Sequence, residues 1–375
     1  MSAPDPKIAI FVTAAVALHA EGGGVQRCTH EYLAVLRAAG FTIHPAAYPF
    51  EHRPWVRVMR KLRPRPYRDA VPRGFADTVR REALAHNAGW VLLNQSEAAP
   101  LAVELADLRA RGVRIGLLSH GTDSADYLHV ARIRAEFHAG PAISAHDHRW
   151  LGDALFEEQV QHRNVDAVLC LSETDRLQAE WLGARNVAVL PRVITDRSLD
   201  RQPVAGRIGT IATLTHEPNY EGIVLLCRAL ARLPGHSDVR LRLVGNPAAL
   251  GERLAREFTF IDYLGGLTDA QLTEEARTWS VFVNPMFCYP RGCSTKLAVP
   301  LEWRMPVATT RAGARGYVWD ETLVPLVETP DELAALARRL SDPVKGAQQL
   351  PAVRALAERS PRPADLVETV RRVLS

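Results

Sequence analysis

Short apolar runs alternate with longer stretches of helical periodicity along the first half of the chain. Between two of these runs, Val25, Cys28 and Leu36 recur on one helix face, and Gly40 follows as a stop signal. Runs that are apolar on both faces and separated by helices are typical of a parallel sheet covered by helices. The strands predicted in this half are 7–14, 41–48, 89–95, 113–121, 165–173 and 186–191.

The same alternation restarts in the second half. Its predicted strands are 208–214, 239–246, 258–266, 279–286 and 305–310. Residues 191–206 are polar, contain two prolines and break the periodicity, so we interpret them as a linker.

We therefore predict an α/β protein of two Rossmann-like domains, each a doubly wound parallel sheet, facing a central cleft. The first domain spans 1–190 and the second spans 207–360. A terminal helix follows at 361–375, and packing back on the first domain is one option for it.

Composition places the chain among ordinary globular proteins. It has 375 residues, 47% apolar and 23% charged, and a length that favours two domains over one. No apolar run is long enough to cross a bilayer, and the start lacks a basic leader. The five cysteines are scattered and show no CxxC spacing, which favours reduced thiols. We expect a cytoplasmic protein.

The positive charge is unevenly placed. Residues 52–73 hold eight Lys/Arg against one acidic residue, although the formal net charge of the whole chain is only +4. This stretch is either a solvated basic surface or a surface attracted to phosphate groups. In the second case the protein could contact the inner membrane face peripherally or attract a lipid-linked acceptor. No aromatic-rich module accompanies the charge, so we expect no nucleic-acid partner.

Two candidate loops lie in the first half. The first contains Gly22, Gly23 and Gly24 at a predicted helix start, where backbone amides can approach an anion closely. It lacks the third glycine of the dinucleotide fingerprint, and a purely structural turn is the alternative. The second, LSHGTD, places His120 and Asp123 where a strand ends, and both are candidates for substrate binding or proton transfer. A merely structural histidine is the alternative there.

Two further loops lie in the second half. TLTHEPNYEG offers polar side chains that can hydrogen-bond phosphate oxygens, or simply cap a helix. PRGCSTK leads small residues into a helix start and adds two cations, a combination suited to a diphosphate. The candidate donor-binding residues of these loops are Thr213, His216, Asn219, Arg291, Ser294, Thr295 and Lys296.

We expect no metal site. The HDH motif at 146–148 has no third ligand at a suitable spacing, so an exposed helix face is the preferred interpretation.

In order and spacing these motifs resemble the glycosyltransferases of the GT-B fold, in particular the group 1 (family 4) type. The resemblance extends from about residue 7 to residue 330. The motifs that carry it are GGGVQR, HGTD, LSETDRLQAEWLG, VLPRVI, IGTIATLTHEPNYEGI, VRLRLVGNP, YLGGLTDAQL, VFVNPM, STKLAVPLEW and MPVATTRAGARGY.

The resemblance implies transfer of a sugar from a nucleotide-diphosphate sugar to a glycan, lipid-linked or small-molecule acceptor. It also implies retention of configuration and no metal or cofactor beyond the nucleotide sugar. Gly23 and Gly24 match the glycine loop of the family's first domain, and His120 falls near a histidine that contacts the transferred sugar. Lys296 matches a basic residue that holds the donor diphosphate, and Gly313 matches the glycine turn of the second domain.

The chain also departs from the family pattern. The loop TLTHEPNYEG lacks the arginine and lysine that many members carry there, and Val299 stands where a glutamate commonly binds the ribose. Glu302 lies three residues later and is a candidate donor-binding residue, and whether it substitutes for that glutamate is left open by the sequence. These departures keep two other functions open: a catalytically silent relative that binds a nucleotide, a sugar or a partner protein, and a sugar-nucleotide epimerase.

Overall fold

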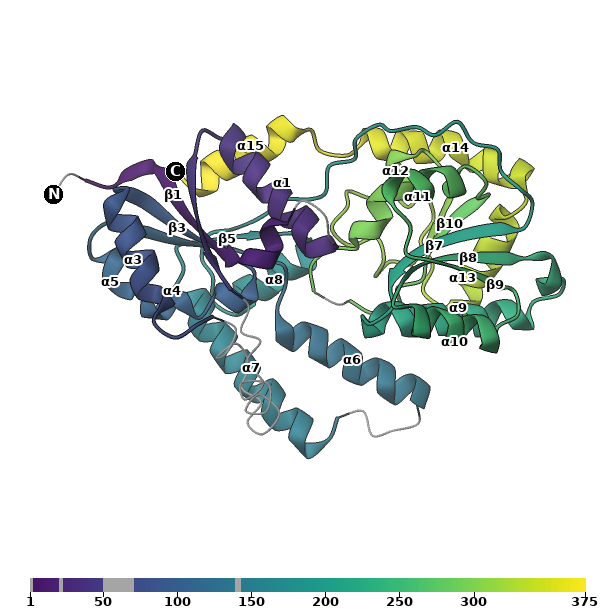
Figure 1. The fold of residues 1–375 in the computed structure, drawn as a ribbon, viewed down its shortest axis with the longest axis horizontal. Coiled ribbons are helices and arrows are strands. Elements are labelled where there is room, and N and C mark those ends of the chain that lie inside the picture. Colours follow the sequence, from purple (N-terminus) through teal and green to yellow (C-terminus); the bar gives the residue numbers. More distant parts are fainter. Residues whose placement is uncertain (1–2, 20–22, 50–70, 139–142, 290) are drawn as a thin grey trace. The chain divides into compact units, whose positions relative to one another are not determined.

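The structure is a computed structural model that describes residues 3–19, 23–49, 71–138, 143–289 and 291–375 (Figure 1). The chain divides into two compact units. The first unit comprises Met1–Pro191, Pro290–Gly292 and Arg362–Ser375, and the second comprises Arg192–Tyr289 and Cys293–Pro361.

The first unit is built on a six-stranded parallel sheet of order β2-β1-β3-β4-β5-β6. Because β3 is buried along its whole length, the run AGWVLLN has no polar face and is apolar up to its last residue, Asn94. The strands are β1 (Asp5–Ala14), β2 (Thr42–Tyr48), β3 (Ala88–Asn94), β4 (Arg114–Leu118), β5 (Ala167–Cys170) and β6 (Val187–Val189).

Helices connect these strands, and α1 buries Cys28, Tyr32, Leu33 and Leu36 on one face. Within its described residues, the helices of this unit are α1 (Gly24–Ala38), α3 (Phe75–Ala85), α4 (Leu101–Glu104), α5 (Ala106–Arg109), α6 (Asp123–His138), α7 (Ala145–Arg163), α8 (Glu173–Trp181) and α15 (Pro363–Val373), with 3-10 turns η1 (Ala15–Leu18) and η2 (Ser96–Ala98).

The C-terminal helix α15 lies beside α1 within the first unit (Figure 1). The Arg371 guanidinium donates to the carbonyl oxygens of Ala38 and Ala39, each at 3.4 Å. The last helix of the chain therefore stabilises its first helix.

The second unit is built on a five-stranded parallel sheet of order β11-β10-β7-β8-β9. Its strands are β7 (Arg207–Thr213), β8 (Arg240–Asn246), β9 (Ile261–Gly265), β10 (Val281–Asn284) and β11 (Val307–Thr309). Its helices are α9 (Glu217–Arg232), α10 (Ala248–Glu257), α11 (Asp269–Ala276), α12 (Ala298–Glu302), α13 (Pro330–Leu340) and α14 (Pro343–Glu358), with 3-10 turns η3 (His236–Asp238) and η4 (Thr295–Leu297).

Apolar cores cover both faces of this second sheet. One core includes Leu241 and Leu243 of β8 together with Leu333 of α13, and the other includes Trp279 and Phe282 together with Val353 of α14. Burial on both faces fixes the sheet between two helical layers.

The predicted fold class is confirmed, because each predicted strand is present as part of one of two parallel sheets. Within residues 192–206, which the sequence marks as a linker, the amides of Gln202 and Val204 donate to the carbonyls of Arg277 and Thr278. Among the described helices, none is long and apolar enough to span a bilayer. Residues 52–70 of the basic stretch lie outside the described residues.

Candidate functional site

Buried polar side chains gather at the carboxyl ends of the strands of the first sheet. Thr13 lies in β1, Asn94 ends β3, His120 follows β4 and Ser172 follows β5, and each of these residues is at most 9% exposed. Because all strands of the sheet are parallel, their carboxyl ends share one edge. The first unit therefore carries a polar cluster at the edge where open α/β sheets bind ligands.

His120 is held in this cluster by a neutral amide. Its Nε2 lies 3.2 Å from Asn94 Oδ1, and the Asn94 amide nitrogen lies 2.9 Å from the hydroxyl oxygens of both Thr13 and Thr29. The Tyr32 ring tilts against the imidazole at a centroid distance of 5.6 Å. The ring of His120 is thus clamped between a carboxamide and an aromatic face.

The surroundings of His120 favour its uncharged form. Burial, together with a smaller contribution from the positive charge of Arg291, lowers the pKa of His120 to about 3. At physiological pH the imidazole is neutral and accepts or donates hydrogen bonds without carrying a charge. It cannot act as a proton donor in the way that an imidazolium can.

Asp123, the first residue of α6, forms an ion pair with Arg291. Arg291 also lies 3.6 Å from Glu97 and donates to the Ser96 hydroxyl at 3.4 Å. Burial raises the pKa of Asp123, the Arg291 charge opposes that rise and the carboxylates of Glu97, Glu158 and Asp126 add to it. The net result is a pKa of about 6. The carboxyl therefore titrates close to neutrality, as a proton-transfer group must.

Two glycines make room for this arrangement. Gly121 has φ of +93°, and a Cβ there would stand 2.3 Å from Arg291 Cβ. Gly292 has φ of +70°, and a Cβ there would stand 2.9 Å from the His120 carbonyl oxygen. Both positions need a left-handed backbone and a close approach that only glycine allows without strain. They keep the Arg291 segment against the end of β4.

A buried carboxylate supports the start of α6. Glu158 of α7 is 1% exposed, and it accepts from the Ser124 amide at 2.9 Å and from the Ser124 hydroxyl at 2.5 Å. A carboxylate at a helix start satisfies an amide that lacks an intrahelical partner. This contact fixes the residue directly after Asp123.

In the second unit, the carboxyl end of β7 faces Lys296. The Lys296 ammonium donates to Asn219 Oδ1 at 2.8 Å, and the Asn219 amide donates to the Thr213 carbonyl at 3.0 Å. Asn219 belongs to the first turn of α9, whose N-cap residue is His216. The structure therefore joins Lys296 to Asn219 and Asn219 to the backbone of Thr213, with His216 at the start of the same helix.

Lys296 is a cation without a balancing charge in the described part of the chain, where no carboxylate lies within ion-pair distance of it. Burial, together with a smaller contribution from the nearby charge of Arg315, lowers the pKa of Lys296 to about 7. The ammonium form is therefore poorly stabilised until an anion arrives.

A second asparagine organises the adjoining loops. The amide of Asn284, the last residue of β10, donates to the Ser294 hydroxyl at 3.2 Å, the Thr309 hydroxyl at 3.1 Å and the Gly313 carbonyl at 3.2 Å. The Tyr317 hydroxyl also donates to the Ser294 carbonyl, at 2.7 Å. These bonds fix the backbone two residues before Lys296.

The remaining candidates take simpler positions. Gly23 caps α1 and Gly24 begins it, Thr295 begins η4, and Glu302 ends α12 with its carbonyl accepting from the Arg197 amide. Gly22 lies outside the described residues. The predicted helix after Lys296 is only a 3-10 turn and five α-helical residues, so few peptide dipoles align there. The positive charge of this loop comes mainly from Lys296 itself.

Sequence reasoning missed Asn94, Asn284 and Glu158. The two asparagines did leave a signal, because each is the polar last residue of an otherwise apolar run, WVLLN and VFVN. A polar residue that ends a buried strand lies at the ligand edge of a parallel sheet. Glu158 left no comparable signal on α7.

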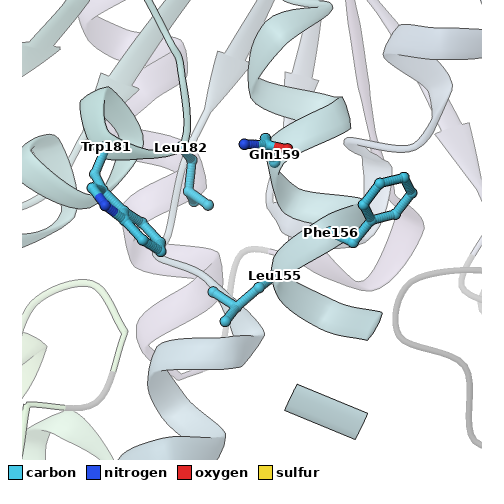
Figure 2. A pocket seen from close by; sticks show the side chains of 5 residues that line it. All are labelled: Leu155, Phe156, Gln159, Trp181 and Leu182. Atoms are coloured by element: carbon cyan, nitrogen blue, oxygen red, sulfur yellow. The ribbon is translucent and has the colours of Figure 1, made fainter. Parts of the chain in front are cut away.

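A surface pocket of about 290 Å³ lies between α7 and α8 (Figure 2). It is lined by Leu155, Phe156, Gln159, Trp181 and Leu182. Because this lining is apolar apart from one amide, the pocket offers no group for acid–base chemistry. Elsewhere among the described residues, no group of three or more His, Cys, Asp and Glu is arranged to hold a metal ion.

No protein-family model matches the sequence. No curated protein matches it either. Solved structures do match the fold along nearly the whole chain.

A sucrose-phosphate synthase from Thermosynechococcus elongatus is 16% identical with a TM-score of 0.65, and the match covers 98% of this chain and 98% of that one. Anabaena HepE, solved in complex with UDP and glucose, is 13% identical with a TM-score of 0.57, over 98% and 99% of the two chains. The lipopolysaccharide outer core galactosyltransferase WaaB is 10% identical with a TM-score of 0.56, over 98% and 95%.

At these identities the likeness establishes the fold. The two parallel sheets, their strand order and the match over whole chains together show that this protein has the GT-B fold.

Proposed function

We propose that this protein is a glycosyltransferase that takes a sugar from a nucleotide-diphosphate sugar and passes it to a hydroxyl of a glycan, a lipid-linked sugar or a small molecule. In this proposal the second unit holds the nucleotide diphosphate and the first unit binds the acceptor. A uridine nucleotide is the first donor to test, since HepE, which shares the fold, was solved with UDP and glucose.

The observation that carries the proposal is the Lys296 ammonium beside the first turn of α9. Desolvating a cation costs free energy unless an opposite charge compensates, and in the described residues Lys296 has only the Asn219 amide. A diphosphate would supply the missing charge. The same charge would stabilise the diphosphate as it leaves, because negative charge grows on it in the transition state.

The first unit offers groups suited to a sugar and an acceptor hydroxyl. His120 is a neutral imidazole, and Asp123 has a pKa of about 6 beside Arg291. We assign His120 to binding a sugar hydroxyl and Asp123 to orienting the acceptor or taking part in proton transfer. Retention of configuration and independence from a divalent cation belong to this proposal on the strength of the motif resemblance.

Activity is tested by UDP release from a panel of UDP-sugars with the purified protein. We expect Lys296→Ala to lower turnover at least about tenfold, which corresponds to about 1.4 kcal/mol of lost transition-state stabilisation. Lys345→Ala is the matched control, because Lys345 is an exposed lysine of α14 in the same unit. Turnover that Lys296→Ala leaves unchanged would remove Lys296 from the mechanism.

A catalytically silent relative is the second candidate. Arg291 is engaged by Asp123 and Glu97, and the loop after β7 carries no arginine or lysine. The same experiment separates the two candidates: UDP that raises the melting temperature, together with no UDP release from any donor, would favour the silent protein. An epimerase would convert the sugar of the donor without needing an acceptor.

A further inference from the structure

Asn94 joins three elements of the first unit through one side chain. It is fully buried at the end of β3, and its amide nitrogen lies 2.9 Å from Thr13 Oγ1 of β1 and 2.9 Å from Thr29 Oγ1 of α1. Its carbonyl oxygen lies 3.2 Å from Nε2 of His120, just after β4. Both threonines are fully buried as well. The carboxamide therefore has no freedom to turn toward solvent.

The chemistry of these contacts determines where the imidazole proton lies. A carboxamide nitrogen carries two hydrogens, and here the two threonine oxygens take both. The carboxamide oxygen can only accept, so the contact with His120 is a hydrogen bond only if Nε2 carries a proton. A neutral imidazole carries one N–H, and Nδ1 is then left with a lone pair.

We propose that Asn94 is a positioning residue that fixes His120 as the Nε2–H tautomer, so that Nδ1 is a permanent hydrogen-bond acceptor for a substrate hydroxyl. Within the described residues, His120 has no other side-chain hydrogen bond than the one to Asn94. The substrate part of this inference rests on the proposed function, whereas the tautomer does not.

The surroundings keep the ring uncharged. Arg291 places a positive charge near the imidazole, and its own partners are the carboxylates of Asp123 and Glu97. The tilted ring of Tyr32 covers another side of His120, and the Tyr32 hydroxyl is in position to donate to the carbonyl oxygens of Ser119 and Leu169. Among the described residues no carboxylate is hydrogen-bonded to the ring, so none of them stabilises a second proton on it.

A hydrogen-bond acceptor that is fixed in one tautomer discriminates between ligands. Nδ1 of this tautomer binds a group that donates, such as a sugar hydroxyl, and repels a carbonyl or phosphate oxygen. A site built to accept from a hydroxyl discriminates strongly against an analogue that lacks it. We expect that, among donor analogues in which one hydroxyl is replaced by fluorine or hydrogen, at least one is turned over much more slowly by the native protein. The same replacement should lower turnover much less in a His120→Ala variant.

The tautomer is measured directly by nitrogen NMR on the full chain labelled with 15N-histidine. His120→Asn identifies which of the 13 histidine signals belongs to His120. We expect that signal to show a neutral Nε2–H ring from pH 5 to pH 8. An Nδ1–H ring, or a ring that becomes protonated within that range, would overturn the proposal.

Two substitutions test whether Asn94 is the cause. Asn94→Asp keeps an acceptor opposite Nε2 but adds a charge, so the ring should remain protonated at Nε2 and begin to titrate near neutral pH. Asn94→Leu removes the acceptor and should give a mixture of tautomers with about a tenfold loss of kcat/KM or more. Thr29→Val is the milder variant if Asn94→Leu does not fold, and it should produce a partial mixture. A single unchanged tautomer in Asn94→Leu, or in Thr29→Val if only that variant folds, would show that Asn94 does not fix the ring.

The two proposals fail separately. An Nε2–H ring in a protein without any transferase activity would remove the proposed function and leave the tautomer assignment in place. An Nδ1–H ring in an active transferase would do the reverse.

Discussion

At the scale of single residues, two glycines that the sequence motifs select are glycine for different reasons. At Gly313 a Cβ would stand 2.4 Å from Thr309 Oγ1 and 2.6 Å from Asn284 Nδ2, and the Gly313 amide donates to the Thr310 hydroxyl at 3.0 Å. At Gly23 the backbone has an ordinary φ of −83°, and the nearest described atom to a Cβ is Gln26 Oε1 at 3.9 Å. Packing requires the first glycine and does not require the second.

This difference predicts opposite outcomes for the same substitution. Gly313→Ala should destabilise the protein by about 1–3 kcal/mol, because the buried Asn284 network must shift to admit the methyl group. Gly23→Ala should leave the melting temperature nearly unchanged and lower activity if substrate approaches the Gly23 backbone. Thermal unfolding followed by circular dichroism, with turnover measured on the same samples, checks both. A Gly23→Ala protein with native stability and native turnover would assign the glycine no role.

Lys296 gives a prediction for pH. With its pKa at about 7, the free protein loses the Lys296 charge above neutrality, while a bound diphosphate holds the proton on the ammonium. The affinity for UDP should therefore be nearly constant below pH 7 as far as Lys296 is concerned, and should fall by up to about tenfold per pH unit above it. Calorimetric titration between pH 7 and pH 9 measures this, a range in which the phosphate groups of UDP are already ionised.

Lys296→Arg is the matched control, since a guanidinium stays charged throughout this range. Its UDP affinity should be flat with pH, and a wild-type affinity that is equally flat would contradict a lysine pKa near 7. The stability of the free protein should change with pH in the opposite direction to the UDP affinity. The unfolded lysine keeps its proton up to about pH 10.5, whereas the folded lysine loses it at about pH 7. The contribution of Lys296 to the free energy of unfolding therefore rises between these two pH values, and it is lost as the pH falls through 7.

At the scale of elements, the sequence predicts the strands well because they are buried on both faces. The residues of β3 and β5 are buried without exception, so each reads as an unbroken apolar run. The element after Lys296 was harder to predict. Pro300 is the third residue of α12, a position in the first turn that needs no amide hydrogen, and the helix ends two residues later. The apolar pattern KLAVPLEW predicts a short helix, but not that its beginning is a 3-10 turn.

The polar networks that join elements were not predictable from local pattern. Asn94 contacts residues 81 and 65 positions away, and Arg291 meets Asp123 across 168 positions. The contact of Asn94 with Thr13 depends on strand order, which brings β1 and β3 side by side, and the Arg291 pair depends on where a segment much later in the chain lies. The sequence therefore indicated candidate loops, and the contacts around His120 and Asp123 could be found only from the fold.

At the scale of the whole molecule, the two units are interleaved along the chain rather than simply consecutive. Residues 290–292 and 362–375 belong to the first unit, although the residues directly before each of these two segments belong to the second. Arg291 is consequently a first-unit residue, ion-paired with Asp123, while Lys296 four residues on from Gly292 belongs to the second unit. One loop of sequence thus supplies charged side chains to both units.

This division predicts where each ligand protects the backbone. If the second unit holds the diphosphate, UDP alone should slow amide exchange in the start of α9 and in residues 293–297, because Asn219 and Lys296 then gain a shared anionic partner. Residues 120–127 of the first unit should change little until a sugar or an acceptor is added. Exchange measured by mass spectrometry on the whole chain, with the Lys296→Ala variant as control, reports both regions in one experiment. Protection by UDP that is confined to residues 120–127 would reverse the assignment of the two units, since a diphosphate bound near Arg291 must compete with Asp123 and Glu97 for its charge.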